Sequence, residues 1–277
     1  MGSLYGDKVK FFREGIEADA LTEIPKGIEL EFSPVEEAGE CNCPVRYREI
    51  EGVARYCLIN WAGKKSPSVL FHHGSGENNY TKRIRKIFQI KNHHKINVIA
   101  VSIPFNRNLK EYLYGIGSLQ RFSFLIASST QLTESLGAWL KNLGSEKIVV
   151  SGISLGGWIT NLHYSLYGSL DEYRPIFAGA ALGHLFTDTI YREMSASPAK
   201  EHPEILKEAL NFEDSFRAKN PNIVFPLLSR YDQFIHFERQ KGIYLPENTN
   251  VLEKGHITGS MAFKALRNHI FDKAFSK

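Results

Sequence analysis

The 277-residue chain has few cysteines, no long apolar run and little excess charge. Its three cysteines are Cys41, Cys43 and Cys57, and this odd number argues against a disulfide framework. Cys41 and Cys43 have no second cysteine or histidine pair nearby, so we expect no metal site. No window approaches about 18 uninterrupted apolar residues, so we expect no integral membrane segment. The formal net charge is only +4, and composition therefore gives no reason to expect nucleic-acid binding.

Targeting patterns are also missing from residues 1–10. This stretch lacks the apolar core of roughly 7–15 residues that a secretory signal requires. Gly6 occupies the position at which the myristoylation pattern needs Ser or Thr. We therefore expect a cytoplasmic protein, unless a leader was removed from the sequence. The hydrophobic content of 43% excludes a disordered chain, and the absence of repeats or a linker indicates one domain, residues 1–277.

Alternating and uniformly apolar segments follow one another along the chain. Residues 1–25 have a partial apolar face and are expected to form a helical lead-in. Residues 28–33 and 45–50 alternate apolar with polar side chains, which is typical of half-exposed antiparallel strands, and 53–61 is expected to add another early strand. Short apolar runs, typical of strands buried on both faces, follow at 68–72, 97–103, 147–151, 176–182, 223–228 and 249–253.

Helical patterns separate these apolar runs, at residues 79–94, 119–143, 156–168 and 258–275. Strands that alternate with helices indicate βαβ units and a mostly parallel sheet. The sequence therefore predicts an α/β fold, in which a mostly parallel central sheet is flanked by helices and preceded by antiparallel strands.

Residues 184–222 interrupt this alternation. The segment is polar and contains Pro198, Pro203 and Pro221. It is much longer than an ordinary connection, whose median length is roughly 4–6 residues. We expect two short helices with a break between them, forming a cap over the edge of the sheet.

A nucleophile elbow is the strongest motif in the sequence. Residues 152–156 read Gly-Ile-Ser-Leu-Gly directly after an apolar run, and a helical pattern follows. Gly-x-Ser-x-Gly at such a junction places the serine on a tight, strained turn above the sheet. Gly152 and Gly156 are expected there because a Cβ atom would collide across the turn. The motif thus predicts that Ser154 is a nucleophile.

Ser154 needs a base, because a serine hydroxyl is a poor nucleophile until its proton is removed. With this motif the chain order is serine, acid, histidine. His256 follows the last apolar run in a glycine-flanked loop, which places it at the carboxyl edge of the sheet, where open α/β sheets bind ligands. The other histidines after Ser154 are weaker candidates: His163, His184, His202, His236 and His269.

Asp232 is the candidate acid that holds the imidazole in one tautomer. It follows the run 223–228, at the carboxyl end of the penultimate expected strand. The alternative is that Asp232 only caps a turn. Other acidic side chains lie before an expected strand, at the wrong edge, or in the cap: Asp171, Glu172, Asp188 and Asp214.

An oxyanion hole needs two preorganised N–H donors. Leu155, immediately after the nucleophile, is expected to supply one. The second is expected from the loop after the first parallel strand, with Ser75 as first choice and Gly74 as the neighbouring alternative. The adjacent His72 and His73 are expected to brace this loop.

With these motifs the chain resembles serine hydrolases of the α/β-hydrolase superfamily. The resemblance extends from about residue 53 to the end and rests on His73-Gly74-Ser75, Gly152-Ile-Ser-Leu-Gly156, Asp232 and Gly255-His256. It implies hydrolysis of a small-molecule acyl ester, thioester or amide through an acyl-enzyme, without metal or organic cofactor. A serine at the elbow argues against the dehalogenase and epoxide hydrolase branches, which use aspartate. The His-Gly-Ser-Gly loop departs from the His-Gly-Gly-Gly run of one esterase branch.

Two further points stay open in the sequence. An esterase is favoured, but an amidase or peptidase would use the same residues, and a non-catalytic ligand-binding scaffold is a third alternative. The basic segment 82–95 is either an ordinary surface helix with one buried stripe or a contact for anionic lipid or a phosphate-bearing acyl donor. Tyr112, Phe122 and Phe124 are expected in the core rather than in an acyl pocket.

Overall fold

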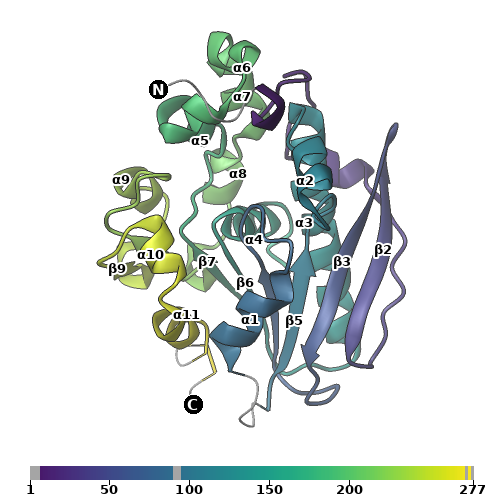
Figure 1. Cartoon of the computed structure of the whole chain (residues 1–277). Helices are drawn as coiled ribbons and strands as arrows, with labels where there is room; N and C mark the ends of the chain where they lie inside the picture. The colour runs from purple at the N-terminus through teal and green to yellow at the C-terminus, as the bar shows by residue number, and fades with distance from the viewer. Residues whose placement is uncertain (1–6, 90–94, 272–273, 276–277) are drawn as a thin grey trace.

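A single mixed sheet runs through the molecule (Figure 1). The computed structural model describes residues 7–89, 95–271 and 274–275, in which nine strands lie in the order β1-β2-β3-β5-β4-β6-β7-β8-β9. Strands β4 to β9 pair in parallel, whereas β1, β2 and β3 are antiparallel and join the sheet through β5. This order confirms the predicted fold class. The strands are β1 (Glu29–Leu30), β2 (Gly39–Tyr47), β3 (Ile50–Asn60), β4 (Ser68–His72), β5 (Asn97–Ser102), β6 (Ile148–Ile153), β7 (Glu172–Ile176), β8 (Leu227–Ser229) and β9 (Asn250–Leu252).

Helices cover both faces of the sheet. Helices α1 and α11 pack together over one face, and α3 and α4 cover the other. The short helices α5, α6 and α7 gather at one end of the molecule (Figure 1). The described helices are α1 (Tyr80–Phe88), α2 (Leu109–Gly115), α3 (Leu119–Asn142), α4 (Leu155–Leu166), α5 (Gly183–Asp188), α6 (Ser197–Glu201), α7 (Pro203–Leu210), α8 (Glu213–Arg217), α9 (Phe237–Lys241), α10 (His256–Ser260) and α11 (Phe263–Ile270).

The central strands are apolar on both faces because helices bury both sides. In β4, Val69 and Phe71 belong to the core that α1 and α11 cover, while Leu70 belongs to the core under α3 and α4. Successive side chains of a strand point to opposite faces, so burial on both faces requires an uninterrupted apolar run. This explains the character of the segment at 68–72.

The first predicted helix is wrong. From residue 7 onward the lead-in has 3₁₀ turns at Asp7–Val9 and Ile24–Gly27 and is otherwise irregular. Its Phe11 instead bonds to a segment nearly two hundred residues later. The Phe11 N–H donates to the Met194 carbonyl over 2.9 Å, and the Ala196 N–H donates to the Phe11 carbonyl over 2.9 Å. These long-range bonds replace the local ones that a helix would use.

A hairpin turn divides the strand predicted at 45–50. Tyr47 ends β2 and pairs with Ile50, the first residue of β3. Arg48 lies between them with φ 52°, the left-handed conformation that closes a two-residue hairpin. Strand β3 then covers most of the segment predicted at 53–61. Of the strand predicted at 28–33, only the two residues of β1 are strand in the structure.

Two later strands are misplaced in the sequence prediction. Strand β7 ends at Ile176, so almost none of the segment 176–182 is strand. Phe177 takes φ 52° and turns the chain out of the sheet. Strand β8 starts only at Leu227, because the segment predicted at 223–228 begins in a 3₁₀ turn and includes a proline, which has no N–H to give the ladder.

The predicted cap region contains more helices than expected. Four short helices, α5 to α8, occupy most of 184–222 instead of two, with a 3₁₀ turn at Ile190–Met194. The backbone bonds of Phe11 tie this region to the start of the described chain. The cap role of residues 184–222 stays a prediction.

The basic segment 82–95 overlaps α1, which ends at Phe88, where Gln89 adopts a left-handed C-cap conformation. Ile84, Ile87 and Phe88 are fully buried, so the expected apolar stripe faces the core. The expected continuation of this helix at 90–94 lies outside the described residues. Lipid contact by the basic side chains stays a prediction.

Candidate active site

Ser154 stands on a sharp turn between β6 and α4. Its backbone angles are φ 56° and ψ −115°, in a region that non-glycine residues rarely occupy. A Cβ atom on Gly152 would lie 2.3 Å from the Gly156 carbonyl oxygen, and one on Gly156 would lie 2.4 Å from the His72 carbonyl oxygen. Both distances are far below van der Waals contact. The turn therefore needs the two glycines that the motif supplies.

A chain of hydrogen bonds connects Ser154, His256 and Asp232. The His256 Nε2 atom lies 3.0 Å from the Ser154 Oγ, and the Nδ1 atom lies 2.7 Å from the Asp232 Oδ2. The Asp232 side chain is completely buried and that of His256 is 11% exposed, so little solvent competes for these bonds. With a neutral imidazole, Nδ1–H donates to the carboxylate and Nε2 accepts the serine proton. The structure thus brings together all three predicted catalytic side chains.

The loop after β8 holds Asp232 in place. Its Oδ1 atom accepts the backbone N–H groups of Phe234 over 2.9 Å and Ile235 over 2.8 Å. Asp232 therefore caps a turn with one oxygen and bonds His256 with the other, and its role as the catalytic acid stays a prediction. The Phe234 and Phe177 rings lie 5.1 and 5.6 Å from the His256 ring and restrict its position.

The sequence predicts His256 within a loop, but in the structure His256 is the first residue of helix α10. The single helix expected at 258–275 is divided into α10 and α11, which Met261 and Ala262 separate. The loops after β8 and β9 are joined by a backbone bond from the Tyr231 N–H to the Lys254 carbonyl, over 3.0 Å. Parallel pairing of these strands brings their carboxyl ends, and hence Asp232 and His256, to the same edge.

The weaker candidates for the base and the acid bond to groups other than Ser154. His163 is buried between α3 and β7, with Nε2 3.0 Å from the Glu134 Oε2 and Nδ1 3.0 Å from the Tyr173 hydroxyl. Asp171 accepts the Ile148 N–H over 2.7 Å at the amino end of β6, which is the opposite edge of the sheet. His184 bonds Asp188 on α5.

Two histidines brace the loop after β4. His73 Nδ1 donates to the Gly74 carbonyl over 2.6 Å, while its Nε2 accepts from Asn106 over 3.3 Å and from the Ile103 N–H over 3.4 Å. His72 Nε2 lies 2.8 Å from the Thr133 hydroxyl. Burial lowers the pKa of His73 to about 4 and that of His72 to about 3, so both rings are neutral at pH 7. Neutral, hydrogen-bonded rings suit a bracing role.

Acidification should therefore destabilise the fold. His72 and His73 bind a proton near pH 6.5 when unfolded but only near pH 3–4 when folded, so the unfolded state holds more protons in between. Each such histidine lowers the free energy of unfolding by up to about 1.4 kcal/mol per pH unit below pH 6.5. Urea unfolding at pH 7.0 and 5.0 measures this loss. His72→Gln, which keeps a hydrogen-bonding group near Thr133, should reduce the pH dependence; an unchanged slope contradicts the assignment.

A small cavity of about 20 Å³ lies beside the serine. Ser75, Ser154 and Leu155 line it on one side, so the predicted oxyanion donors and the nucleophile share one space. The Ser75 hydroxyl bonds the Tyr112 hydroxyl. The remaining wall is apolar and largely aromatic: Phe11, Phe122, Trp158, Leu182, Leu185, Phe186 and Tyr191.

Phe122 is buried in the core, as expected, and in addition it lines this cavity. The expectation for Phe124 was right, because it is fully buried in the core. Phe11, Phe186 and Tyr191 were missed, since no motif connects the start of the chain with the cap. Their rings pack together, with Phe11 and Phe186 centroids 5.0 Å apart and Phe186 and Tyr191 centroids 5.9 Å apart.

Metal-ligating side chains do not cluster in the described part of the chain. Within residues 7–89, 95–271 and 274–275, no three His, Cys, Asp or Glu side chains are grouped to hold a metal ion. Cys41, Cys43 and Cys57 are free thiols. None of the described helices combines the length and apolar character needed to cross a bilayer.

The strand order, the elbow and this hydrogen-bonded group together define an α/β-hydrolase fold. No protein-family model and no characterised sequence relative matches the chain. Solved structures do: an acetyl xylan esterase from a Thermoanaerobacterium species is 12% identical, with 96% of this chain and 98% of that chain covered and a TM-score of 0.56. Est1E from Butyrivibrio proteoclasticus is 12% identical, with 85% and 99% covered and a TM-score of 0.57. Pyrococcus horikoshii acylaminoacyl peptidase is 15% identical, with 84% and 39% covered and a TM-score of 0.54.

Proposed function

We propose that the protein is a serine hydrolase that cleaves a carboxylic ester or thioester through an acyl-enzyme. The observation that carries the proposal is the pair of hydrogen bonds from Ser154 through His256 to Asp232, 3.0 and 2.7 Å long. A buried acid, an oriented imidazole and a strained serine are the parts that nucleophilic acyl transfer needs. The similar solved structures include esterases and a peptidase, which agrees with a hydrolase.

The reaction follows from the bonds of these groups. The Ser154 Oγ attacks the substrate carbonyl carbon while its proton moves to the His256 Nε2. The negative Asp232 stabilises the imidazolium that forms. When the bond to the leaving group breaks, His256 gives the proton to the departing oxygen or sulfur. Water then attacks the acyl-enzyme by the same proton transfers, which releases the acid and restores Ser154.

The oxyanion is proposed to accept hydrogen bonds from the backbone N–H groups of Leu155 and Ser75, with Gly74 as the alternative to Ser75. Leu155 is the first residue of α4, and the first N–H groups of a helix have no acceptor within it. The amino end of α4 also favours negative charge. The His73–Gly74 bond holds the second loop in a defined conformation, as a preorganised donor requires.

Cavity size supports a short acyl group. About 20 Å³ is room for little more than one water-sized group, and the walls are packed aromatic rings. We place the acyl group here because the cavity contains both the nucleophile and the proposed oxyanion donors. Residues 184–222 are proposed to be a cap, since Leu185, Phe186 and Tyr191 of this segment line the cavity beside Ser154.

A fluorophosphonate should label Ser154 and no other residue. The reagent reacts with a serine only where a base and an oxyanion site activate it, which the geometry provides at one position. Intact mass spectrometry should show one adduct, located by peptide mapping at Ser154 and absent from Ser154→Ala. Labelling at another residue, or none in the folded protein, contradicts the proposal.

The peptidase and scaffold alternatives need substrate tests. An amidase would use the same residues, so hydrolysis of p-nitrophenyl acetate is compared with that of the corresponding acetanilide. A scaffold would show neither a burst nor turnover with either compound. The complete set Ser154, His256 and Asp232 favours the enzyme, because a binding protein has no need of all three.

A further inference from the structure

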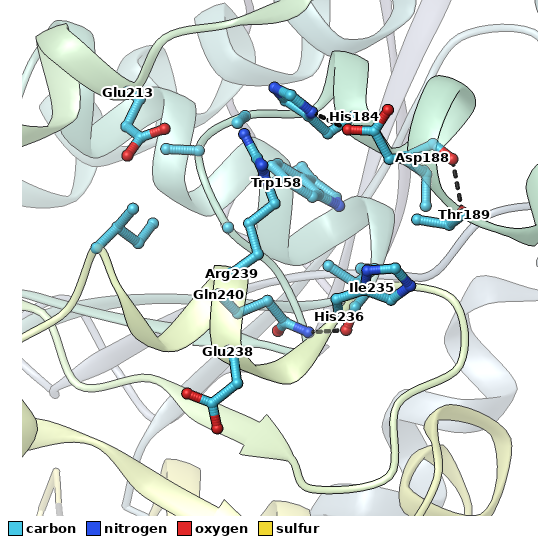
Figure 2. A pocket seen from close by; sticks show the side chains of 15 residues that line it. Trp158, His184, Asp188, Thr189, Glu213, Ile235, His236, Glu238, Arg239 and Gln240 are labelled. Atoms are coloured by element: carbon cyan, nitrogen blue, oxygen red, sulfur yellow. Dashed lines mark hydrogen bonds and ion pairs between the residues drawn. The ribbon is translucent and has the colours of Figure 1, made fainter.

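A second and larger pocket has a volume of about 270 Å³. Figure 2 shows the side chains that line it. Trp158 and Leu185 line both this pocket and the small cavity, so the two spaces adjoin at these side chains. Helices α5 and α9 and the segment 179–181 after β7 enclose the larger pocket. It lies at the carboxyl edge of the sheet, where open α/β sheets bind their ligands.

One wall of the larger pocket comes from the loop that positions the hydrogen-bonded pair of Asp232 and His256. Ile235 and His236 line the pocket, and the Ile235 N–H donates to Asp232, the partner of His256. The small cavity contains the proposed oxyanion donors instead. In acyl transfer the leaving group departs with the proton of the histidine. A substrate with its acyl group in the small cavity therefore directs its leaving group toward the larger pocket.

The acidic side chains of the larger pocket already have cationic partners. Asp188 lies 3.2 Å from Lys207 and also bonds His184. Burial raises the pKa of Asp188, but the hydrogen bonds from His184, Thr187 and Lys207 outweigh it and lower the pKa to about 2. The other two form ion pairs along their own helices: Glu213 with Arg217 over 2.6 Å, and Glu238 with Lys241 over 3.7 Å.

Unlike the acidic side chains of the pocket, Arg239 has no ion-pair partner among the described residues. It lines the pocket, and Figure 2 shows its side chain extending from α9 toward Trp158. Within the described part of the chain, its guanidinium has no hydrogen bond or ion pair. The charged side chain of the pocket without an ion pair among the described residues is therefore the positive Arg239. Trp158 and Ile235 provide an apolar surface in the same pocket.

We propose that this pocket binds the leaving group of the substrate, and that this group is a ring-sized alcohol carrying a carboxylate that pairs with Arg239. A guanidinium matches a carboxylate with two parallel N–H···O bonds. A monoanion suits the pocket better than a phosphate dianion, because the single charge of Arg239 balances one negative charge, and the acidic side chains of the pocket already have their own cationic partners. This proposal rests on the proposed ester hydrolysis.

A charge-matched pair of acetates tests the proposal. 4-Acetoxybenzoate and its methyl ester differ in one negative charge at the distal end of the leaving group. Arg239→Gln should lower the ratio of kcat/KM for the acid over that for the methyl ester about tenfold, because only the acid loses its partner. Arg239 is exposed, so the substitution leaves the fold intact.

Arg192→Gln is the matched control. Arg192 is an exposed arginine of the cap region that does not line the pocket. The ratio should stay within twofold of the unsubstituted protein. An unchanged ratio in Arg239→Gln, or an equal fall in both variants, overturns the proposal, since the second result indicates only a general attraction between charges.

Binding of 4-hydroxybenzoate to Ser154→Ala separates this proposal from the hydrolase assignment. Trp158 lines the pocket, so its fluorescence should respond to the ligand, and Arg239→Gln should weaken the binding about tenfold. Binding that depends on Arg239 without any ester turnover supports the pocket and contradicts the proposed hydrolysis. Turnover without such binding and without an effect of Arg239 contradicts the pocket alone.

Discussion

Ser154→Ala should lower kcat/KM for p-nitrophenyl acetate by about 10⁴-fold or more. The substitution removes the atom that attacks the carbonyl but leaves the Leu155 N–H and the small cavity in place. The turn should persist, because alanine keeps the Cβ atom of the serine and meets the same restrictions on its backbone angles. Steady-state hydrolysis, with far-ultraviolet circular dichroism to verify folding, measures the effect.

Ser33→Ala is the control for this result. Ser33 is exposed in the segment after β1 and lies far along the chain from the elbow. Its replacement should leave turnover within twofold. If Ser154→Ala keeps the activity of the unsubstituted protein while Ser33→Ala behaves in the same way, another nucleophile performs the reaction.

Asp232→Asn should reduce kcat by about 10⁴-fold with little loss of folding. The amide can still accept the Phe234 and Ile235 N–H groups through its oxygen, so the turn survives. Its NH₂ group then faces His256 Nδ1 and forces the imidazole into the tautomer whose Nε2 carries a proton and cannot accept one from Ser154. The rate of fluorophosphonate labelling should fall together with kcat, since both depend on an activated serine.

Asp171→Asn is the matched control, because it alters a carboxylate at the opposite edge of the sheet. The amide oxygen of this variant can still accept the Ile148 N–H, but as an uncharged and weaker acceptor, so a loss of at most about 1 kcal/mol in the free energy of unfolding is expected, with kcat unchanged. A fall in kcat of less than tenfold for Asp232→Asn would indicate that Asp232 only caps its turn.

Local chemistry made several parts of this fold predictable. The uniformly apolar runs at 68–72, 97–103 and 147–151 contain β4, β5 and most of β6, because a parallel strand must be apolar on both faces. The helix predicted at 119–143 is α3 almost residue for residue. The runs at 176–182 and 223–228 failed because their apolar residues are largely buried in turns and loops. Burial alone does not specify a strand.

The aromatic wall of the small cavity was not predictable for a different reason. Phe11 comes from the start of the chain, Phe122 from α3, and Phe186 and Tyr191 from the cap region. Each is an ordinary apolar residue in its own segment, and sequence neighbours give no sign that these rings meet. Likewise, only the structure shows that Asp188, Glu213 and Glu238 pair with other cations, which leaves Arg239 without an ion pair among the described residues.

By itself the sequence determined the elbow, the order of the three candidate catalytic residues and the alternation of strands and helices. These features depend on short-range physics: the steric demands of a tight turn around Gly152 and Gly156, and the apolar pattern that a two-sided sheet requires. Tertiary structure alone decided the size of the cavity beside Ser154, the walls of the larger pocket and the start of α10 at His256. Those depend on how segments up to nearly two hundred residues apart pack against one another, which no local pattern records.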